Sequence, residues 1–232
     1  ICVETDALIN NEIIYLPKKT QPFTGKDLCK NKNGQIKHEG NYIGGNLVDI
    51  TKYTYHLNGQ IKSERNYKDG DLDVKETWWY ENGKIKLKRN IKNYNIDGML
   101  TIWYENGQKK SEANYKDGEL YGKMIEWYES GQKKFDGNYI DGKLEGKSTW
   151  WYKDGQKQFE RNYKDGLENG NVTEWYVNGN IRITGNVKEG YKKDGKVTEW
   201  YEFGQIKFEG TYKDGSGVGK VTEWYESGQK KF

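Results

Sequence analysis

Glycine recurs along this chain at a nearly constant interval. Six of the eight intervals between successive marker glycines are 24 residues long, and the other two are 25. The marker glycines are Gly34, Gly59, Gly83, Gly107, Gly131, Gly155, Gly179, Gly204 and Gly228. A fixed period of this size is typical of proteins built from stacked structural repeats, each of which contacts only its neighbours. We therefore expect a repeat array rather than a globule around one central core.

The composition is compatible with an array that folds around few apolar residues. Only 33% of the residues are hydrophobic and 31% are charged, but 15% are aromatic. Aromatic side chains bury a large area each, so a small number of them can supply the packing. The net charge of +3 is spread evenly, whereas nucleic-acid binding needs a concentrated basic face. We therefore expect no nucleic-acid partner. No run of 18 apolar residues is present, so we expect no transmembrane segment either.

The residues that follow each marker glycine alternate in character. After Gly131, the positions of Lys133, Phe135, Gly137 and Tyr139 alternate with polar residues. A period of two over eight residues predicts a half-buried β-strand, not a helix.

Two turn signals separate the predicted strands. Asn-Gly recurs at Asn58-Gly59, Asn82-Gly83, Asn106-Gly107 and Asn178-Gly179. Asp-Gly recurs at Asp69-Gly70, Asp117-Gly118, Asp141-Gly142, Asp165-Gly166 and Asp214-Gly215. Both dipeptides accept the positive φ angles of tight hairpin turns. The first turn should place Glu126 opposite Phe135, and Tyr128 opposite Lys133, on one face of the sheet.

These features predict an all-β fold, an elongated antiparallel β-hairpin repeat array that forms a single-layer β-meander solenoid. Residues 1–24 should form a capping segment with a short strand at residues 12–16, and residues 25–232 about nine 24-residue hairpin repeats. The chain begins at Ile1 rather than Met and stops at Phe232 within a repeat. We expect a processed or truncated piece of a longer product.

Residues capable of catalysis or metal binding are few. Cys2 and Cys29 predict neither a disulfide framework nor a zinc site, and no histidine is expected beside Cys29 to activate it. His56 replaces a tyrosine of the repeat and is interpreted as its structural substitute. A column of glutamates predicts a solvated or salt-bridged sheet face rather than a cation site. The column comprises Glu126, Glu174, Glu199 and Glu223. We expect no catalytic residue, no cofactor and no metal.

Tryptophans and cations at equivalent positions of successive repeats form a candidate binding strip. Its tryptophans are Trp79, Trp103, Trp127, Trp151, Trp175, Trp200 and Trp224, and its cations are Lys86, Lys110, Lys134, Arg182 and Lys207. The cations, three residues after the marker glycines, are expected opposite the tryptophans, where a cation over an indole face is favourable. Either the cationic stems cover the indoles and brace the sheet, or the strip grips an extended ligand.

The repeated text resembles a known family. Residues 103–118 read W-Y-E-N-G-Q-K-K-S-E-A-N-Y-K-D-G, and variants of this unit extend over residues 25–232. The unit is similar to the bacterial variant of the MORN repeat found in YwqK-like antitoxin proteins. Residues 21–26 also resemble the lead-in of secreted or surface members. The copies depart from the pattern where His56, Ile91 and Val187 replace tyrosines.

The resemblance implies a scaffold made of β-hairpins. The function we expect is a non-catalytic repeat scaffold, antitoxin-like in some relatives, that binds a protein through an extended β surface. The alternative is a cell-surface carbohydrate or cell-wall binding module that uses the Trp/Lys strip, and anionic lipid is a third, less favoured partner. The lead-in and the missing initial Met favour an extracytoplasmic location (periplasmic, surface or secreted) over a cytoplasmic one.

Overall fold

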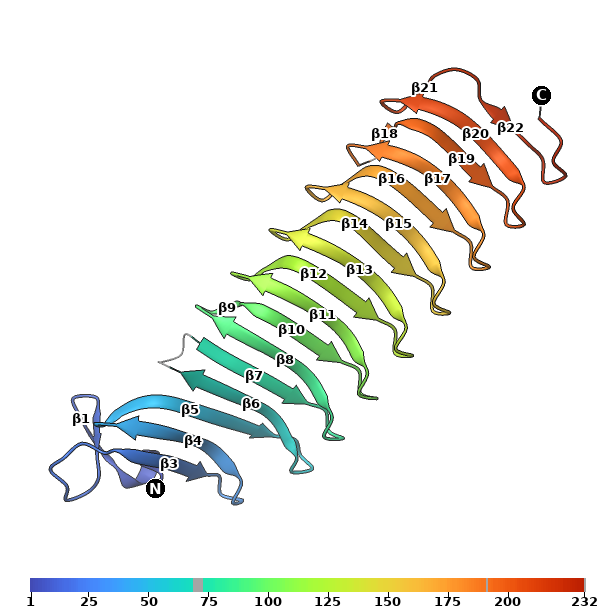
Figure 1. Ribbon diagram of the computed structural model, residues 1–232. Coiled ribbons are helices and arrows are strands. Elements are labelled where there is room, and N and C mark those ends of the chain that lie inside the picture. The colour runs from blue at the N-terminus through green and yellow to red at the C-terminus, as the bar shows by residue number, and fades with distance from the viewer. Residues whose placement is uncertain (69–72, 191, 232) are drawn as a thin grey trace. The chain divides into compact units, whose positions relative to one another are not determined.

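The computed structural model describes residues 1–68, 73–190 and 192–231, and it confirms the all-β antiparallel hairpin array (Figure 1). Its helix, α1 (Val3–Asp6), has four residues. No helix among the described residues is long and apolar enough to cross a membrane. The chain divides into two compact units. Unit 1 comprises Ile1–Gln108 and Tyr115–Gly118, and unit 2 comprises Lys109–Asn114 and Glu119–Phe232.

Unit 1 holds the first ten strands. Their bounds are β1 (Leu8–Asn10), β2 (Ile13–Tyr15), β3 (Gly25–Lys30), β4 (Ile36–Ile43), β5 (Asn46–Tyr55), β6 (Ile61–Lys68), β7 (Asp73–Trp79), β8 (Ile85–Lys92), β9 (Asn95–Ile96) and β10 (Gly98–Trp103). β1 pairs with β2. Strands β3 to β8 pair antiparallel in chain order, and both β9 and β10 pair with β8. This order is the predicted meander.

The strands of the second half follow the same plan. Their bounds are β11 (Lys109–Lys116), β12 (Glu119–Trp127), β13 (Lys133–Ile140), β14 (Lys143–Trp151), β15 (Lys157–Lys164), β16 (Leu167–Trp175), β17 (Ile181–Lys188), β18 (Lys192–Lys193), β19 (Gly195–Trp200), β20 (Ile206–Lys213), β21 (Ser216–Gly217) and β22 (Thr222–Glu223). Within unit 2, β12 to β17 pair in chain order, β19 pairs with β17 and β20, and β22 pairs with β20.

The first turn differs from the predicted two-residue Asn-Gly turn. In the repeat of Gly83, the N–H of Gly83 donates to Tyr80 O at 3.0 Å, and the N–H of Tyr80 donates to Lys84 O at 2.9 Å. Gly83 has a φ of 80°, whereas Asn82 does not have a positive φ. Asn82 instead accepts the N–H of Lys84 through Oδ1 at 3.0 Å. This is a three-residue hairpin loop in which the glycine alone takes the left-handed conformation.

The longer turn shifts the register of the hairpin. Glu126 lies opposite Phe135, as predicted, but a bulge follows, and Trp127 rather than Tyr128 lies opposite Lys133. The prediction of Tyr128 opposite Lys133 was therefore wrong, because the extra turn residue moves the pairing by one position. The same bulge recurs between Trp150 and Trp151 and in other hairpins that the first turn joins.

The second turn is the one that the Asp-Gly dipeptide predicts. Asp141 and Gly142 have φ angles of 47° and 73°, and Asp165 and Gly166 have 51° and 81°. Two consecutive positive φ angles characterise the type I′ turn, whose twist matches that of the flanking strands. The predicted turn at Asp69-Gly70 lies outside the described residues.

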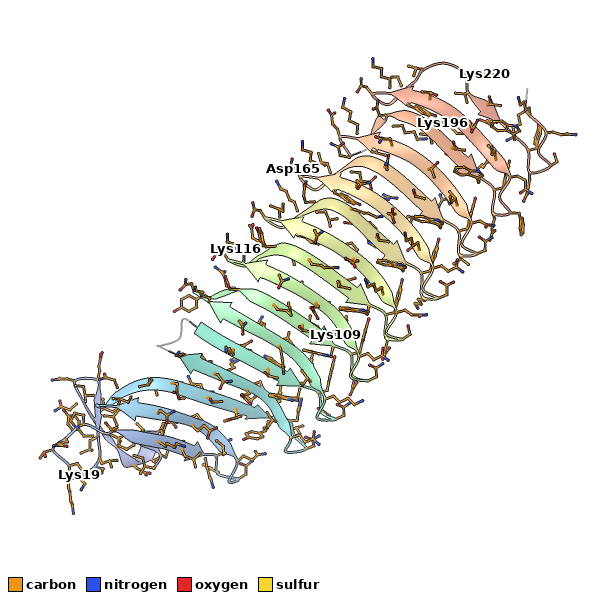
Figure 2. The ribbon with its side chains drawn as sticks, viewed as in Figure 1. Lys19, Lys109, Lys116, Asp165, Lys196 and Lys220 are labelled. Atoms are coloured by element: carbon orange, nitrogen blue, oxygen red, sulfur yellow. A yellow bond between two sulfur atoms is a disulfide. The ribbon has the colours of Figure 1, made fainter. Side chains whose placement is uncertain are left out.

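Alternate side chains of each strand point to opposite sides of the sheet (Figure 2). In unit 2 the better-buried side, here called the core face, carries Phe135 (5% exposed), Val172 (7%) and Val197 (3%). Trp150 lies opposite Phe159 on the same side, and its ring centroid is 5.0 Å from that of Phe135. Aromatic and β-branched neighbours at this spacing supply the packing that a single layer requires. The side that carries the strip tryptophans is called the Trp face.

The N-terminal segment is fastened to β3 by a disulfide that was not predicted. Cys2 and Cys29 are bonded, with Cα atoms 4.5 Å apart and a sequence separation of 27. The N–H of Leu28 donates to Ile1 O at 2.6 Å, so residues 1–3 lie alongside β3. Two cysteines without a motif gave no indication of this pairing, because only the return of the chain onto β3 brings them together. The expectation of no disulfide was wrong.

Candidate functional site

Within each unit, a ladder of hydrogen bonds joins first turns to the repeat that follows them. In unit 2 the hydroxyl of Tyr152 donates to Trp175 O at 2.9 Å, and that of Tyr176 donates to Trp200 O at 2.8 Å. In unit 1 the Nε2 atom of His56 lies 2.9 Å from Trp79 O, the equivalent acceptor. The interpretation of His56 as a structural substitute for tyrosine is thereby supported. Each bond ties neighbouring repeats at a fixed distance.

Asparagine side chains of the turns form a second ladder. Asn82 donates through Nδ2 to Glu105 O at 3.0 Å, and Asn178 donates to Glu202 O at 3.0 Å. These bonds satisfy carbonyls of the next turn, which would otherwise depend on water. The turn edge of each unit is therefore held rigid by its own side chains.

All seven strip tryptophans are half-buried. In unit 2, lysines lie over three of them. The Nζ atoms of Lys109, Lys133 and Lys157 lie 5.8, 5.6 and 5.4 Å from the ring centroids of Trp127, Trp151 and Trp175. Each lysine comes from the repeat before its tryptophan and stands two residues after a marker glycine. The bulge places it on the Trp face.

The same lysines are ion-paired with carboxylates of their own strands. Lys133 Nζ lies 2.9 Å from Asp136, and Lys157 Nζ lies 2.8 Å from Glu160. A second lysine, Lys147, reaches Glu160 at 2.6 Å from the neighbouring strand. The Trp face thus carries alternating charges over aromatic rings, and its cations are largely neutralised locally.

The predicted pairing of the strip cations with the tryptophans was wrong. Lys86 Nζ lies 5.5 Å from the ring centroid of Tyr80, and Lys207 Nζ lies 5.9 Å from that of Tyr201. Lys134 pairs instead with Glu126 at 3.0 Å. These cations stand three residues after the marker glycines, and the bulge turns that position away from the tryptophans. Lys110 occupies the same position, beside Lys109 in β11.

Three members of the glutamate column form ion pairs. Glu126 pairs with Lys134, and Glu174 lies 2.6 Å from Arg161 and 3.5 Å from Arg182. Glu223 lies 3.4 Å from Lys231. Burial opposes the charge of Arg161, but its pKa is raised because Glu168 and Glu174 outweigh that effect. The column is a structural feature of the core face.

A buried polar cluster surrounds the disulfide, and sequence reasoning missed it. His38 lies directly opposite Cys29, contrary to expectation, and His38 Nε2 lies 2.8 Å from Asp27 Oδ2. Asp27 and His38 are 1% and 5% exposed. Ligand-type atoms of Asp27, Cys29 and His38 lie within 4.8 Å of one another, but Cys29 is disulfide-bonded and so provides no thiolate. Asp27 also accepts the N–H of Val3 at 2.8 Å, so the cluster fastens the N-terminal segment.

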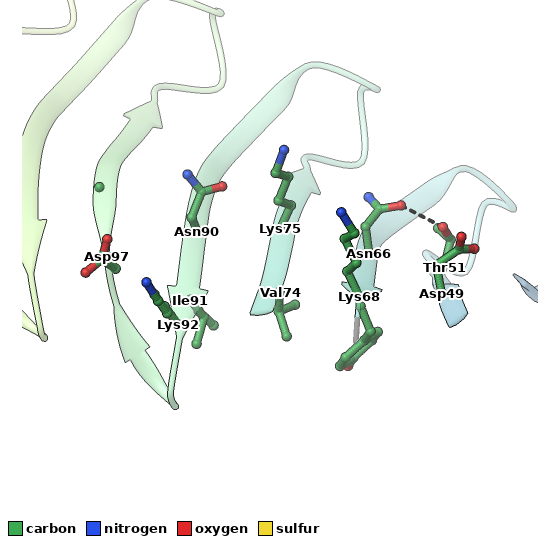
Figure 3. A pocket seen from close by; sticks show the side chains of 12 residues that line it. Asp49, Thr51, Asn66, Lys68, Val74, Lys75, Asn90, Ile91, Lys92 and Asp97 are labelled. Carbon is green, nitrogen blue, oxygen red and sulfur yellow. Dashed lines mark hydrogen bonds between the residues drawn. The ribbon is translucent and has the colours of Figure 1, made fainter. Parts of the chain in front are cut away.

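A hollow of about 630 Å³ opens at the second-turn ends of β5 to β9 in unit 1 (Figure 3). Lys68, Lys75 and Lys92 line it together with the amide of Asn66, which accepts a hydrogen bond from Thr51 at 2.6 Å. These groups offer charge and hydrogen bonds, and the described lining residues place no nucleophile beside a base. The arrangement favours recognition over chemistry.

Comparison with known proteins places the repeats in a family. The model of the MORN repeat variant matches residues 49–69, 72–93, 96–117, 120–141, 144–165 and 193–214, which is more than half of the chain. No curated protein matches the chain. Two solved structures are similar, "Crystal Structure of TcdB2-TccC3-TEV" (14% identity, TM-score 0.28) and "Crystal Structure of TcdB2-TccC3-Cdc42" (10%, 0.27).

These two alignments cover 94% and 91% of this chain, but the chain spans only 14% and 13% of the proteins matched. TM-scores this low do not establish a shared fold. The family match rests on the repeats themselves, whose strands, turns and hydrogen-bond ladders the structure shows. The chain belongs to the MORN repeat variant family.

Proposed function

We propose that this chain is a non-catalytic repeat scaffold that binds a protein partner. The observation that carries the proposal is the ladder of side-chain hydrogen bonds, which holds equivalent side chains of successive repeats in one arrangement. A surface that is rigid before binding loses little conformational entropy on binding. Repeat proteins use such surfaces to contact extended stretches of a partner.

The Trp face braces the sheet in this proposal. The rings of Trp151 and Trp175 are covered by Lys133 and Lys157, whose charges are already paired with carboxylates. A ligand on this face would have to displace those lysines. The contacts with a partner are therefore expected on other surfaces of the array.

The test combines capture of a partner with a variant of the Trp face. The immobilised chain is incubated with extract of the source cells, and a protein retained in a fixed ratio and released by free chain is the expected result. The variant Trp151→Ala/Trp175→Ala should melt at a lower temperature and bind that protein equally well per folded molecule. Retention of no protein contradicts the proposal.

The carbohydrate alternative is separated by the same variant. Half-buried tryptophans are its motivating feature, since sugar rings pack on indoles. If cell-wall glycans bind the chain and the tryptophan variant loses them while circular dichroism stays β-like, the strip is a glycan site. An antitoxin-like role is one form of protein binding, and it requires the captured protein to be a toxin that the chain inhibits.

We also propose an extracytoplasmic location. Disulfides persist in oxidising compartments and are rare in the cytosol, and the bond between Cys2 and Cys29 supports the former. Fractionation of source cells followed by thiol labelling tests this. Recovery of the reduced protein in the cytoplasmic fraction would contradict it.

A further inference from the structure

A row of charged residues crosses four strands in the middle of unit 1. Lys52 in β5 lies opposite Arg65 in β6, Arg65 lies opposite Glu76 in β7, and Glu76 lies opposite Arg89 in β8. Glu76 is 5% exposed and lies 2.8 Å from Arg65 Nε and 2.7 Å from Arg89 Nε. Three cations thus share one carboxylate: Glu76 pairs with Arg65 and with Arg89, and Lys52 has no carboxylate partner within the row.

The other end of the row opposes two cations directly. Like charges on directly opposed residues destabilise a sheet. Lys52 Nζ lies 4.7 Å from the ring centroid of Tyr67, and the guanidinium carbon of Arg65 lies 5.3 Å from that of Trp78. Aromatic rings therefore support both cations, but of the two only Arg65 is also paired with a carboxylate, Glu76. The charge of Lys52, directly opposite a second cation, is not neutralised within the row, which suggests a use other than stability.

The equivalent row in unit 2 shows what packing alone requires. There Ser148 lies opposite Arg161, Arg161 opposite Val172, and Val172 opposite Gly185. Arg161 is the single charged member and is paired with two glutamates. The same positions of the repeat therefore accept small and apolar residues, and the fold does not need the cations of unit 1.

A hollow of about 350 Å³ lies beside the opposed cations. Lys37, His38, Lys52 and Arg65 line it, and the floor includes Ser63, which is 1% exposed. Ser63 Oγ and Thr54 Oγ1 lie 2.6 Å apart and share one hydrogen bond, so one hydroxyl proton remains to donate elsewhere. Ammonium, guanidinium and hydroxyl donors around a recess are the groups that recognise a carboxylate.

The chain's own N-terminal segment already places a carboxylate at this recess. Glu4 in α1 lines the hollow, and its Oε2 atom accepts a hydrogen bond from Lys37 Nζ at 2.7 Å. That bond is the main reason why the pKa of Glu4 lies below its usual value, and Lys52 contributes at longer range. The Glu4 side chain is still 50% exposed, so it occupies only the rim.

We infer that the face of β5 and β6 around Lys52 and Arg65 binds an acidic peptide segment of a protein partner, with one carboxylate seated in the hollow. This inference rests on the proposed scaffold function and names the chemistry of the partner. The recess favours a peptide over an anionic membrane, because a single side chain can enter it and a flat bilayer surface cannot reach its floor.

The test uses a fluorescein-labelled peptide of eight residues in which Glu alternates with Gly, and anisotropy is the readout. The Glu→Gln version of the peptide is the ligand control. Lys52→Gln/Arg65→Gln should weaken binding of the acidic peptide by about tenfold or more, because hydrogen bonds to charged groups are lost. The matched control, Lys88→Gln/Lys123→Gln, removes two charges from the Trp face, one in β8 and one in β12. It should change affinity by about twofold at most at physiological salt.

Circular dichroism and the intact mass of the disulfide-bonded protein confirm that both variants are folded. Equal losses in the two variants, or equal binding of the Gln peptide, overturn the inference. Binding of anionic vesicles or sulfated oligosaccharides but not of the peptide also overturns it. Partner capture separates the two proposals. If wild type and Lys52→Gln/Arg65→Gln retain the same protein equally, only the acidic-peptide inference fails; if neither retains a protein, the scaffold proposal fails.

Discussion

Tyr152 tests whether the repeats stabilise one another through the tyrosine ladder. Its hydroxyl donates to Trp175 O at 2.9 Å and its ring is half-buried. Tyr152→Phe removes the bond alone and should lower the free energy of unfolding by about 1 kcal/mol. Tyr152→Ala also removes the ring and should lower it by about 2–4 kcal/mol in total. Ring packing should therefore account for the larger part of the effect.

The matched position is Tyr225, the equivalent tyrosine of the final described repeat. Its side chain is 54% exposed, and Lys231 lies 5.2 Å from its ring centroid. Because half of the ring is already in water, Tyr225→Ala should lower the free energy of unfolding by about 1 kcal/mol or less. The difference between the two alanine variants measures what a neighbour on each side contributes.

Urea titration followed by tryptophan fluorescence gives the overall stability of each variant. Hydrogen exchange of the amides in β14 to β17 gives the local effect, since a repeat array can open in parts. Faster exchange in Tyr152→Phe should be confined to these strands. Equal losses for Tyr152→Ala and Tyr225→Ala, or no loss for Tyr152→Phe, would refute the reasoning.

Three further predictions concern the disulfide, the substituted tyrosine and the ion pairs. Cys29→Ser should lower the free energy of unfolding by about 3 kcal/mol, as expected for a loop of 27 residues, and dithiothreitol should destabilise wild type but not the variant in the same urea titration. His56→Tyr should change the free energy of unfolding by no more than about 1 kcal/mol, because the tyrosine hydroxyl replaces Nε2 as the partner of Trp79 O. His56→Ala removes this partner and should lower the free energy of unfolding by about 1–2 kcal/mol; thermal unfolding measures both. Burial opposes ionisation of Glu160, but Lys147 and Lys157 outweigh this effect and hold its pKa below the usual value. The ionised carboxylate therefore stabilises the fold above its unfolded-state pKa, and this stabilisation is lost as the pH falls through the lowered value. The free energy of unfolding should depend less steeply on pH in Glu160→Gln, and an unchanged slope would count against this ion-pair cluster.

The period and the alternation of the sequence were sufficient to predict strands and turns. The Asp-Gly turns and the pairing of Glu126 with Phe135 follow from residue types at fixed offsets, because such features are local to one repeat. The structural role of His56 follows from its position, which other repeats fill with tyrosine. Each depends on chain geometry within about 24 residues. A repeated sequence shows the same local pattern many times, which makes the pattern easy to recognise.

Contacts between repeats could not be predicted in the same way. The alternation of residue types predicted that Lys134 lies opposite Trp127. The loop contains one residue more than a two-residue hairpin, so Lys133 lies opposite Trp127 and Lys134 pairs with Glu126 instead. Lys109, from the preceding strand, therefore lies over Trp127. The disulfide was missed for a related reason, since the path of residues 1–6 back onto β3 has no counterpart in the repeats.

The charged row of unit 1 shows where function is to be sought in a periodic molecule. Positions that hold the array together must satisfy the same physical requirement in every repeat, and Tyr152 and Tyr176 illustrate it with the same bond. A position that does not take part in these contacts can hold different residue types in different repeats. Lys52 and Arg65 differ in a direction that opposes stability, because they set two cations face to face. Within the fold, Glu76 pairs with Arg65 and Glu4 lies at the rim of the hollow. A carboxylate from a partner, seated deeper in the hollow, is the group that we infer completes the neutralisation of Lys52.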